Sequence, residues 1–271
     1  MQGLRIFAAA LLALVLTANA EAKDEFKIFD RFSQDSETRI DNSAYAAFLS
    51  AYTATDDTGI VLVKYAAAKA DPQAVAQLNG YIESQEAIDP TKLNKDEAFA
   101  YWGNLYNAVT VKVILDNYPV KSIRDIKSGL VSLGPWGRKL ATVNGQELSL
   151  NNIEHDILRE FWDEPRVHYV VNCASIGCPN LSQTPWTGED LDTRLTEAAR
   201  GYINHPRGVS VRNGRITASS IYNWYGKDFG GNDASKIAHW REYAEPELLN
   251  ALEGVSRIRK YDYDWSLNEQ K

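Results

Sequence analysis

The sequence is poor in cysteine and histidine, with 2 cysteines and 4 histidines among 271 residues. Beyond residue 20, no apolar run approaches the roughly 20 residues that a membrane-spanning helix needs. Lysines and arginines form no cluster, and the formal net charge is −7. There is neither a fixed-period repeat nor a low-complexity linker. These absences argue against a transmembrane segment in the mature chain, a nucleic-acid-binding protein and a solenoid.

Residues 1–20 have the pattern of a secretory signal peptide. Arg5 precedes an apolar stretch of about eleven residues, and Ala18 and Ala20 provide a small-x-small cleavage site. We therefore expect an exported protein, periplasmic or secreted, with a soluble mature chain of about 250 residues. An apolar content of 44% is ample for a packed core in a chain of that length.

Helical patterns dominate the first half of the mature chain. Residues 21–41 are charged and weakly periodic, which suggests an N-terminal arm or a short first helix. The pattern predicts a helix over 42–52, another that starts at Pro72 after the N-cap Asp71, and a long helix over 95–117. Asn94 and Glu97 have the spacing of a capping box for the long helix, and Asn151 and Glu154 suggest a second box.

The second half mixes helices and strands. The pairs Asn144-Gly145 and Asn213-Gly214 predict two β-hairpins. The β-branched and aromatic run 166–172 predicts a buried strand, and Thr187 is expected to open a helix that Pro206 closes. Short helices near 220–229 and 233–244 and a last strand near 256–265 complete the pattern. We predict one α+β domain over 42–271, with a helical N-terminal part, a small sheet and two β-hairpins.

The two cysteines, Cys173 and Cys178, follow the predicted strand and admit two interpretations. An even cysteine count in an exported protein favours a disulfide, and the small residues between them suit a tight turn. Alternatively, Cys173 is a nucleophile at a strand end, where turn N–H groups near Ala174 lower its pKa or bind an oxyanion. The sequence leaves both interpretations open.

A nucleophilic thiol needs a base, and two histidines are candidates. If the predicted strand is straight, His168 and Cys173 point to opposite faces, which disfavours His168 as the partner. His155 comes from a different element and is the preferred base, and its neighbour Glu154 is a further candidate site residue or a helix cap. Cysteine and histidine lack the paired spacing of a zinc finger, so we predict no metal and no cofactor.

Two groups of polar and aromatic residues suggest a cleft. On the long helix, Asn104 and Asn107 share one face, whereas Trp102 and Tyr106 share another. The two amides either orient a base or a substrate, or tie the helix to neighbouring loops. The segment "SSIYNWYGKDFGG" groups aromatics with one carboxylate, which can act as an acid, orient a histidine or pair with an arginine. The candidate ligand-binding residues are Trp102, Tyr106, His168, Asn172, Trp224, Tyr225 and Asp228.

Five ordered blocks resemble the uncharacterised family catalogued as domain of unknown function 547. They are "YWGNLYNA", "LSLNNIEHDILR", "RVHYVVNCASIGCPNL", "SSIYNWYGKDFGG" and "YDYDWSLN", and they extend over about 98–268. The resemblance implies no established reaction. It implies a site within the blocks, and it permits an analogy with papain-like or transglutaminase-like thiol enzymes.

Two functional hypotheses follow. The first is an exported thiol-dependent hydrolase or acyltransferase acting on a peptide, amide or ester, with Cys173 as nucleophile, His155 as base and Asn104, Asn107 or Asp228 as orienting groups. The second is a non-catalytic module with a Cys173–Cys178 disulfide, which binds an envelope peptide or glycan in an aromatic cleft. Dithiol redox exchange is disfavoured, because the cysteine spacing is longer than that of the usual motif.

Overall fold

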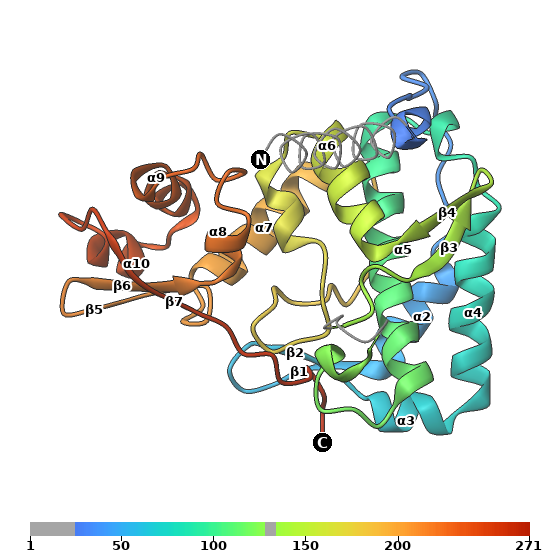
Figure 1. Cartoon of the computed structure of the whole chain (residues 1–271), viewed down its shortest axis with the longest axis horizontal. Coiled ribbons are helices and arrows are strands. Elements are labelled where there is room, and N and C mark those ends of the chain that lie inside the picture. Colours follow the sequence, from blue (N-terminus) through green and yellow to red (C-terminus); the bar gives the residue numbers. More distant parts are fainter. Residues whose placement is uncertain (1–24, 128–133) are drawn as a thin grey trace, which may run out of the picture.

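The first half of the chain packs around one long helix, α5 (Lys95–Asn117) (Figure 1). Nearly every side chain from Glu97 to Leu115 is buried. The helix begins where predicted, because the Asn94 side chain accepts a hydrogen bond from the backbone N–H of Glu97. The computed structural model describes residues 25–127 and 134–271, so the predicted signal peptide lies outside the described residues.

Short helices surround α5 on one side, and the predicted helices of this region are confirmed. They are α2 (Ser43–Tyr52), α3 (Tyr65–Ala70) and α4 (Pro72–Glu86). Asp71 caps α4 as predicted by accepting from the first backbone N–H groups of the helix. Within the predicted arm, the 3-10 turn Phe26–Phe29 buries both terminal phenylalanines in the same core.

The strands form three small sheets. In the first, β1 (Thr53–Thr55) pairs with β2 (Val61–Val63), and in the second, β3 (Lys139–Val143) pairs with β4 (Gln146–Ser149). The third contains β5 (Val209–Arg212), β6 (Arg215–Ser219) and β7 (Ile258–Asp262), with β7 parallel to β6. Both predicted hairpins are confirmed, and both Asn-Gly turns have positive φ at the two turn residues. The prediction of an α+β fold is confirmed.

The C-terminal part builds a second core beside the first. It contains α7 (Leu191–Ile203), α8 (Ile221–Trp224), α9 (Asp233–Tyr243) and α10 (Pro246–Ala251), together with β5–β7. In Figure 1 this part lies on the left, and the chain after β7 returns toward the first core. The prediction that Thr187 opens α7 is wrong, since the helix starts at Leu191.

The predicted strand over 166–172 is also wrong. This segment starts as a 3-10 helix, Pro165–Tyr169, in which Pro165 occupies the first position and Glu164 accepts from the backbone N–H of Arg166. It packs so closely on α5 that a Cβ on Gly103 would lie 2.7 Å from Val170 Cγ1. The β-branched composition therefore reflects burial and not strand geometry.

The second predicted capping box is wrong as well. Asn151 already has helical φ and ψ, and its side chain makes no capping hydrogen bond. Instead, Ser149 and Asn152 exchange hydrogen bonds at the helix start. The following residues, Asn152–Leu158, form a π-helical segment that continues into α6 (Arg159–Phe161). This wider winding sets the directions of Glu154 and His155.

No helix in residues 25–127 or 134–271 combines the length and the apolar character that crossing a membrane requires.

Candidate functional site

A cavity of about 620 Å³ opens where the two cores meet. Its walls come from α5, residues 134–138, the π-helical segment, α8 and the chain after β7, together with residues 173–178, which we call the cysteine loop. The aromatic lining residues are Tyr106, Trp136, Trp224, Tyr225, Tyr263 and Trp265. Besides the tyrosines, the titratable lining residues are Arg138, Glu154, His155, His168, Cys173 and Cys178. Reactive groups from distant parts of the sequence therefore line one open cavity.

Side-chain amides build the turn that presents Cys173. The Asn107 amide donates to the Val170 carbonyl at 2.9 Å and accepts from the Asn172 backbone N–H at 2.8 Å. The Asn172 side chain in turn accepts from the Ala174 N–H at 2.8 Å. Ala174 has a φ of 55°, a conformation that is unfavourable for alanine and that these bonds stabilise. Asn107 and Asn172 thus act through the loop, and neither lines the cavity.

The far side of the cysteine loop is fixed by the C-terminal chain. The N–H groups of Ile176 and Gly177 donate to the carbonyls of Ser266 and Asp264, both at 2.8 Å. A Cβ on Gly177 would lie 2.8 Å from the Asp264 nitrogen, so only glycine permits this close contact. Tyr202 also donates to the Gly177 carbonyl, at 2.7 Å. The loop is therefore held on both sides of Cys173.

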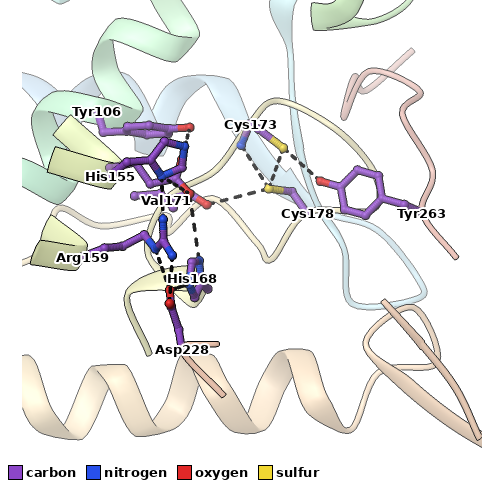
Figure 2. Close-up of polar contacts among 10 residues, drawn as sticks. Tyr106, His155, Arg159, His168, Val171, Cys173, Cys178, Asp228 and Tyr263 are labelled. Atoms are coloured by element: carbon purple, nitrogen blue, oxygen red, sulfur yellow. Dashed lines mark hydrogen bonds and ion pairs between the residues drawn. The ribbon is translucent and has the colours of Figure 1, made fainter. Parts of the chain in front are cut away.

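The Cys173 sulfur has three polar neighbours, two of which, Tyr263 and Cys178, are labelled in Figure 2. Its Sγ lies 2.9 Å from the Tyr263 hydroxyl, 3.2 Å from Ser175 Oγ and 3.0 Å from Cys178 Sγ. The Cys173 N–H donates to Cys178 Sγ at 3.0 Å. Both cysteines are free thiols, because a disulfide bond is about 2.05 Å long.

The two thiols differ in acidity. The hydrogen bond with Cys178 is the largest influence that lowers the pKa of Cys173, and it is opposed by burial and aided by Ser175 and Tyr263. Burial raises the pKa of the Cys178 thiol well above its usual value. Cys173, which is also the more exposed of the two, is therefore the thiol that ionises first.

A network of charged and polar side chains links His155 to His168. Asp228 accepts a bidentate pair of hydrogen bonds from Arg159, at 2.6 and 2.8 Å, and lies 2.7 Å from His168 Nε2. Arg159 also donates to His155 Nδ1 at 3.1 Å, as Figure 2 shows. Arginine only donates, so His155 Nδ1 is unprotonated and the neutral ring carries its proton on Nε2. The predicted role of His155 as a general base therefore has no support at Nδ1.

In this network, burial and hydrogen bonding shift the pKa values of Asp228 and His168 in opposite directions. Burial disfavours the charged form of Asp228, but the hydrogen bonds from His168 and Arg159 outweigh it and hold the pKa of that carboxyl far below its usual range. Burial lowers the pKa of His168 despite its hydrogen bond to Asp228. At neutral pH, this network thus contains an ionised Asp228 carboxylate, a charged Arg159 and a neutral His168 imidazole.

Substituting Asp228 with asparagine is expected to destabilise the protein. Arg159 and His168 would lose a charged acceptor in a partly buried position, which costs about 1–3 kcal/mol in the free energy of unfolding. Because the folded-state pKa of Asp228 is depressed, its contribution is present above the unfolded pKa of about 3.9 and is lost as pH falls below it. Urea unfolding at pH 7 and pH 3 should therefore show a larger difference between wild type and Asp228→Asn at pH 7. An equal difference at both pH values would contradict this role.

Glu154 lies between the histidines and the aromatic wall. It is buried, and one of its carboxylate oxygens accepts from the Tyr106 hydroxyl at 3.2 Å. Its other oxygen lies 3.9 Å from His155 Nδ1 and 4.0 Å from His168 Nδ1. The expectation that His168 and Cys173 face opposite ways depended on a straight strand, which this segment does not form, and both residues line the cavity. Among the described residues, no hydrogen bond joins either of these histidines to a cysteine sulfur.

Comparisons with known proteins gave a family match over part of the chain. Residues 90–203 match the model of the family described as "Protein of unknown function, DUF547". This segment is similar to the DUF547 family. The match confirms the resemblance seen in the sequence, although it covers less than half of the chain and ends before the last two blocks. Neither the curated proteins nor the solved structures gave a match.

The DUF547 segment supplies the cysteine loop and Glu154, His155 and His168, whereas Asp228 and part of the aromatic wall lie beyond it. The predicted cleft residue Trp102 is fully buried, where it contacts Phe29 and Tyr101, and its place in an aromatic cleft is a wrong prediction. Tyr106, Trp224 and Tyr225 do line the cavity.

Three aromatic residues of the wall were missed by sequence reasoning. Trp136, Tyr263 and Trp265 line the cavity, and Trp265 packs 5.5 Å from Trp224 between ring centroids. Tyr263 and Trp265 belong to the block "YDYDWSLN", so that resemblance was the available signal. Trp136 has no comparable signal, because it comes from an irregular segment.

Two further groups that were predicted to serve the site have other hydrogen-bond partners. Asn104 exchanges two hydrogen bonds with the backbone of Trp186 and lies outside the cavity, as expected of an amide that ties a helix to a loop. The Ala174 N–H, predicted to serve an oxyanion hole, already donates to Asn172. No group of three or more histidine, cysteine, aspartate or glutamate side chains in the described part of the chain is arranged to hold a metal ion.

Proposed function

We propose that the protein is an exported, thiol-dependent hydrolase or acyltransferase that acts on an ester, amide or peptide, with Cys173 as nucleophile. The observation that carries this proposal is the position of the Cys173 sulfur. It faces a cavity large enough for a small ligand, and it is surrounded by two hydroxyl groups and a second thiol, whereas no histidine of the described residues is hydrogen-bonded to it. An ionised thiol needs no base to attack. Residues 1–20 support a periplasmic or secreted location.

The chemistry follows from these contacts. The Cys173 thiolate attacks the substrate carbonyl carbon, a C–S bond forms, and the carbonyl oxygen becomes an oxyanion. The Tyr263 hydroxyl, which lies 2.9 Å from the resting sulfur, and the Nε2–H of His155 are the proposed donors to that oxyanion. When the oxyanion collapses, the C–O or C–N bond breaks and the leaving group takes a proton from water. Water or an acceptor nucleophile then releases the acyl group.

Acylation by p-nitrophenyl acetate tests the proposal. The reduced chain should release p-nitrophenol and gain one acetyl group, which peptide mapping should locate on Cys173. The variant His155→Gln is expected to acylate about 10- to 100-fold more slowly, because one oxyanion donor is changed. A folded, reduced protein that gains no acetyl group on Cys173 would rule out the mechanism.

A second candidate is a binding module in which Cys173 and Cys178 are joined by a disulfide. Two observations favour it: the sulfurs lie 3.0 Å apart, and Trp224 is 47% exposed at the cavity. Exposed indole rings stack on sugar rings and peptide side chains. Titration with an N-acetylated oligosaccharide should then change tryptophan fluorescence in the oxidised protein, and Trp224→Ala should weaken binding. Unchanged affinity in that variant would count against this candidate.

A further inference from the structure

The structure assigns a second role to the cysteine pair. We infer that Cys178 is a resolving thiol, which captures Cys173 after oxidation by a hydroperoxide and closes a reversible disulfide that blocks the site. The inference deepens the proposed function and relies on it in one respect, that Cys173 is the reactive thiol of the cavity. The 3.0 Å between the two sulfurs carries it, since closure requires an approach of only about 1 Å.

The two cysteines are placed unequally. Cys173 is partly exposed and lines the cavity, with the Tyr263 and Ser175 hydroxyls against its sulfur. Cys178 is buried, at 3% exposure, and its sulfur accepts the Cys173 N–H and points toward the Val171 carbonyl at 3.8 Å. An oxidant that enters the cavity therefore meets Cys173 first, with Cys178 directly behind it.

The surroundings hold the pair in this arrangement. The main chain of the loop is tied to the C-terminal segment at Ile176 and Gly177, and Arg207 donates to the Ile176 carbonyl at 2.8 Å. The left-handed turn at Ala174 fixes the direction of Cys173. Because the backbone is held, side-chain rotation supplies the short movement that brings the sulfurs into bonding distance.

The reaction balances in two steps. The Cys173 thiolate attacks one oxygen of the hydroperoxide, an S–O bond forms, the O–O bond breaks, and the leaving alkoxide or hydroxide takes a proton. Sulfur is oxidised to a sulfenic acid as the peroxide is reduced. The Cys178 sulfur then attacks the Cys173 sulfur, an S–S bond forms, the S–O bond breaks, and the Cys178 proton leaves with the hydroxide as water. A dithiol reductant restores both thiols by exchange.

The test uses the reduced full chain and one equivalent of hydrogen peroxide. Intact-mass analysis of the wild type should show the loss of two hydrogens, the loss of alkylation at Cys173, and recovery of both after dithiothreitol. In Cys178→Ala, which keeps a small apolar group at the buried position, dimedone should trap a sulfenic acid at Cys173. Without dimedone, this variant should proceed to irreversible sulfinic acid. In Cys173→Ala, Cys178 should stay reduced under the same treatment.

Several outcomes would overturn the inference. If wild type accumulates sulfinic acid at the rate of Cys178→Ala, or forms no disulfide, Cys178 is not a resolving thiol. If Cys178→Ala does not fold, the wild-type products alone decide, since a resolving thiol leaves no sulfenic acid for dimedone. The proposed acyl transfer can fail independently of this inference. If the disulfide forms but p-nitrophenyl acetate does not acetylate Cys173, the hydrolase or acyltransferase proposal is wrong and the resolving role of Cys178 still holds.

Discussion

Replacement of Cys173 with serine is expected to lower the rate of acylation by p-nitrophenyl acetate by more than about 1,000-fold, because loss of a nucleophile removes the covalent route entirely. Among the described residues, no histidine is hydrogen-bonded to the sulfur that it replaces, so a serine hydroxyl at this position has no base in contact. The release of p-nitrophenol, corrected for the uncatalysed reaction, measures the effect.

The matched control for this prediction is Cys178→Ala. It leaves Cys173 in place with the Tyr263 and Ser175 hydroxyls, so it should retain most of the acylation rate. Loss of Cys178 also removes the hydrogen bond that lowers the pKa of Cys173 most, so that pKa is expected to rise, and the rates are compared at alkaline pH, where the thiol is ionised. If Cys173→Ser and Cys178→Ala lose the rate equally, the nucleophile has been wrongly assigned.

Substituting Asn107 with alanine should have the largest effect on stability among the polar residues of the site. It leaves the Val170 carbonyl and the Asn172 N–H buried without partners, which costs about 2–5 kcal/mol in the free energy of unfolding. The turn at Cys173 depends on Asn172, so alkylation of Cys173 should also lose its fast phase. Urea unfolding and the rate of reaction with iodoacetamide measure the two effects.

Asn104→Ala separates these effects. Asn104 makes an equivalent pair of hydrogen bonds from the same helix, but to Trp186 and away from the cysteine loop. It should therefore lower stability by a similar amount and leave the alkylation rate of the folded protein unchanged. A change in alkylation of the same size in both variants would mean that Asn107 acts only through global stability.

The sequence was sufficient for elements with strong local signals. The bounds of α5 follow from an N-cap at Asn94 and a proline beyond its end, and both hairpins follow from Asn-Gly pairs, because these residues restrict the backbone by themselves. Local chemistry of this kind does not depend on the rest of the fold.

Elements whose composition reflects burial were not predictable. The segment around His168 is β-branched and aromatic because it is enclosed by α5 and the second core, and Pro165 sets a 3-10 helix that the apolar pattern hides. Because α5 is buried on all sides, helix periodicity does not identify an exposed face, and the assignment of Trp102 to a cleft is therefore wrong.

The candidate site was predictable in its members and not in its geometry. The cysteines, Glu154 and His155 were identified from residue type and family-like blocks, and all line the cavity. The pairing of Asp228 with Arg159 joins residues 69 positions apart, which spacing within a single sequence does not encode. Sequence reasoning expected a histidine beside the Cys173 sulfur, but the structure places hydroxyl groups and a second thiol there. The Tyr263 hydroxyl reaches the sulfur only because the chain returns to the cysteine loop after β7.

The pH dependence of alkylation at Cys173 tests the central claim most directly. The reduced, folded chain is treated with iodoacetamide from pH 5 to pH 10, and the modified cysteine is identified by mass analysis, with Cys173→Ala as the control that leaves Cys178 alone. The account predicts that Cys173 reacts first and with a midpoint below the ordinary thiol pKa of about 8.5. A midpoint at or above 8.5, or reaction only after unfolding, would contradict it.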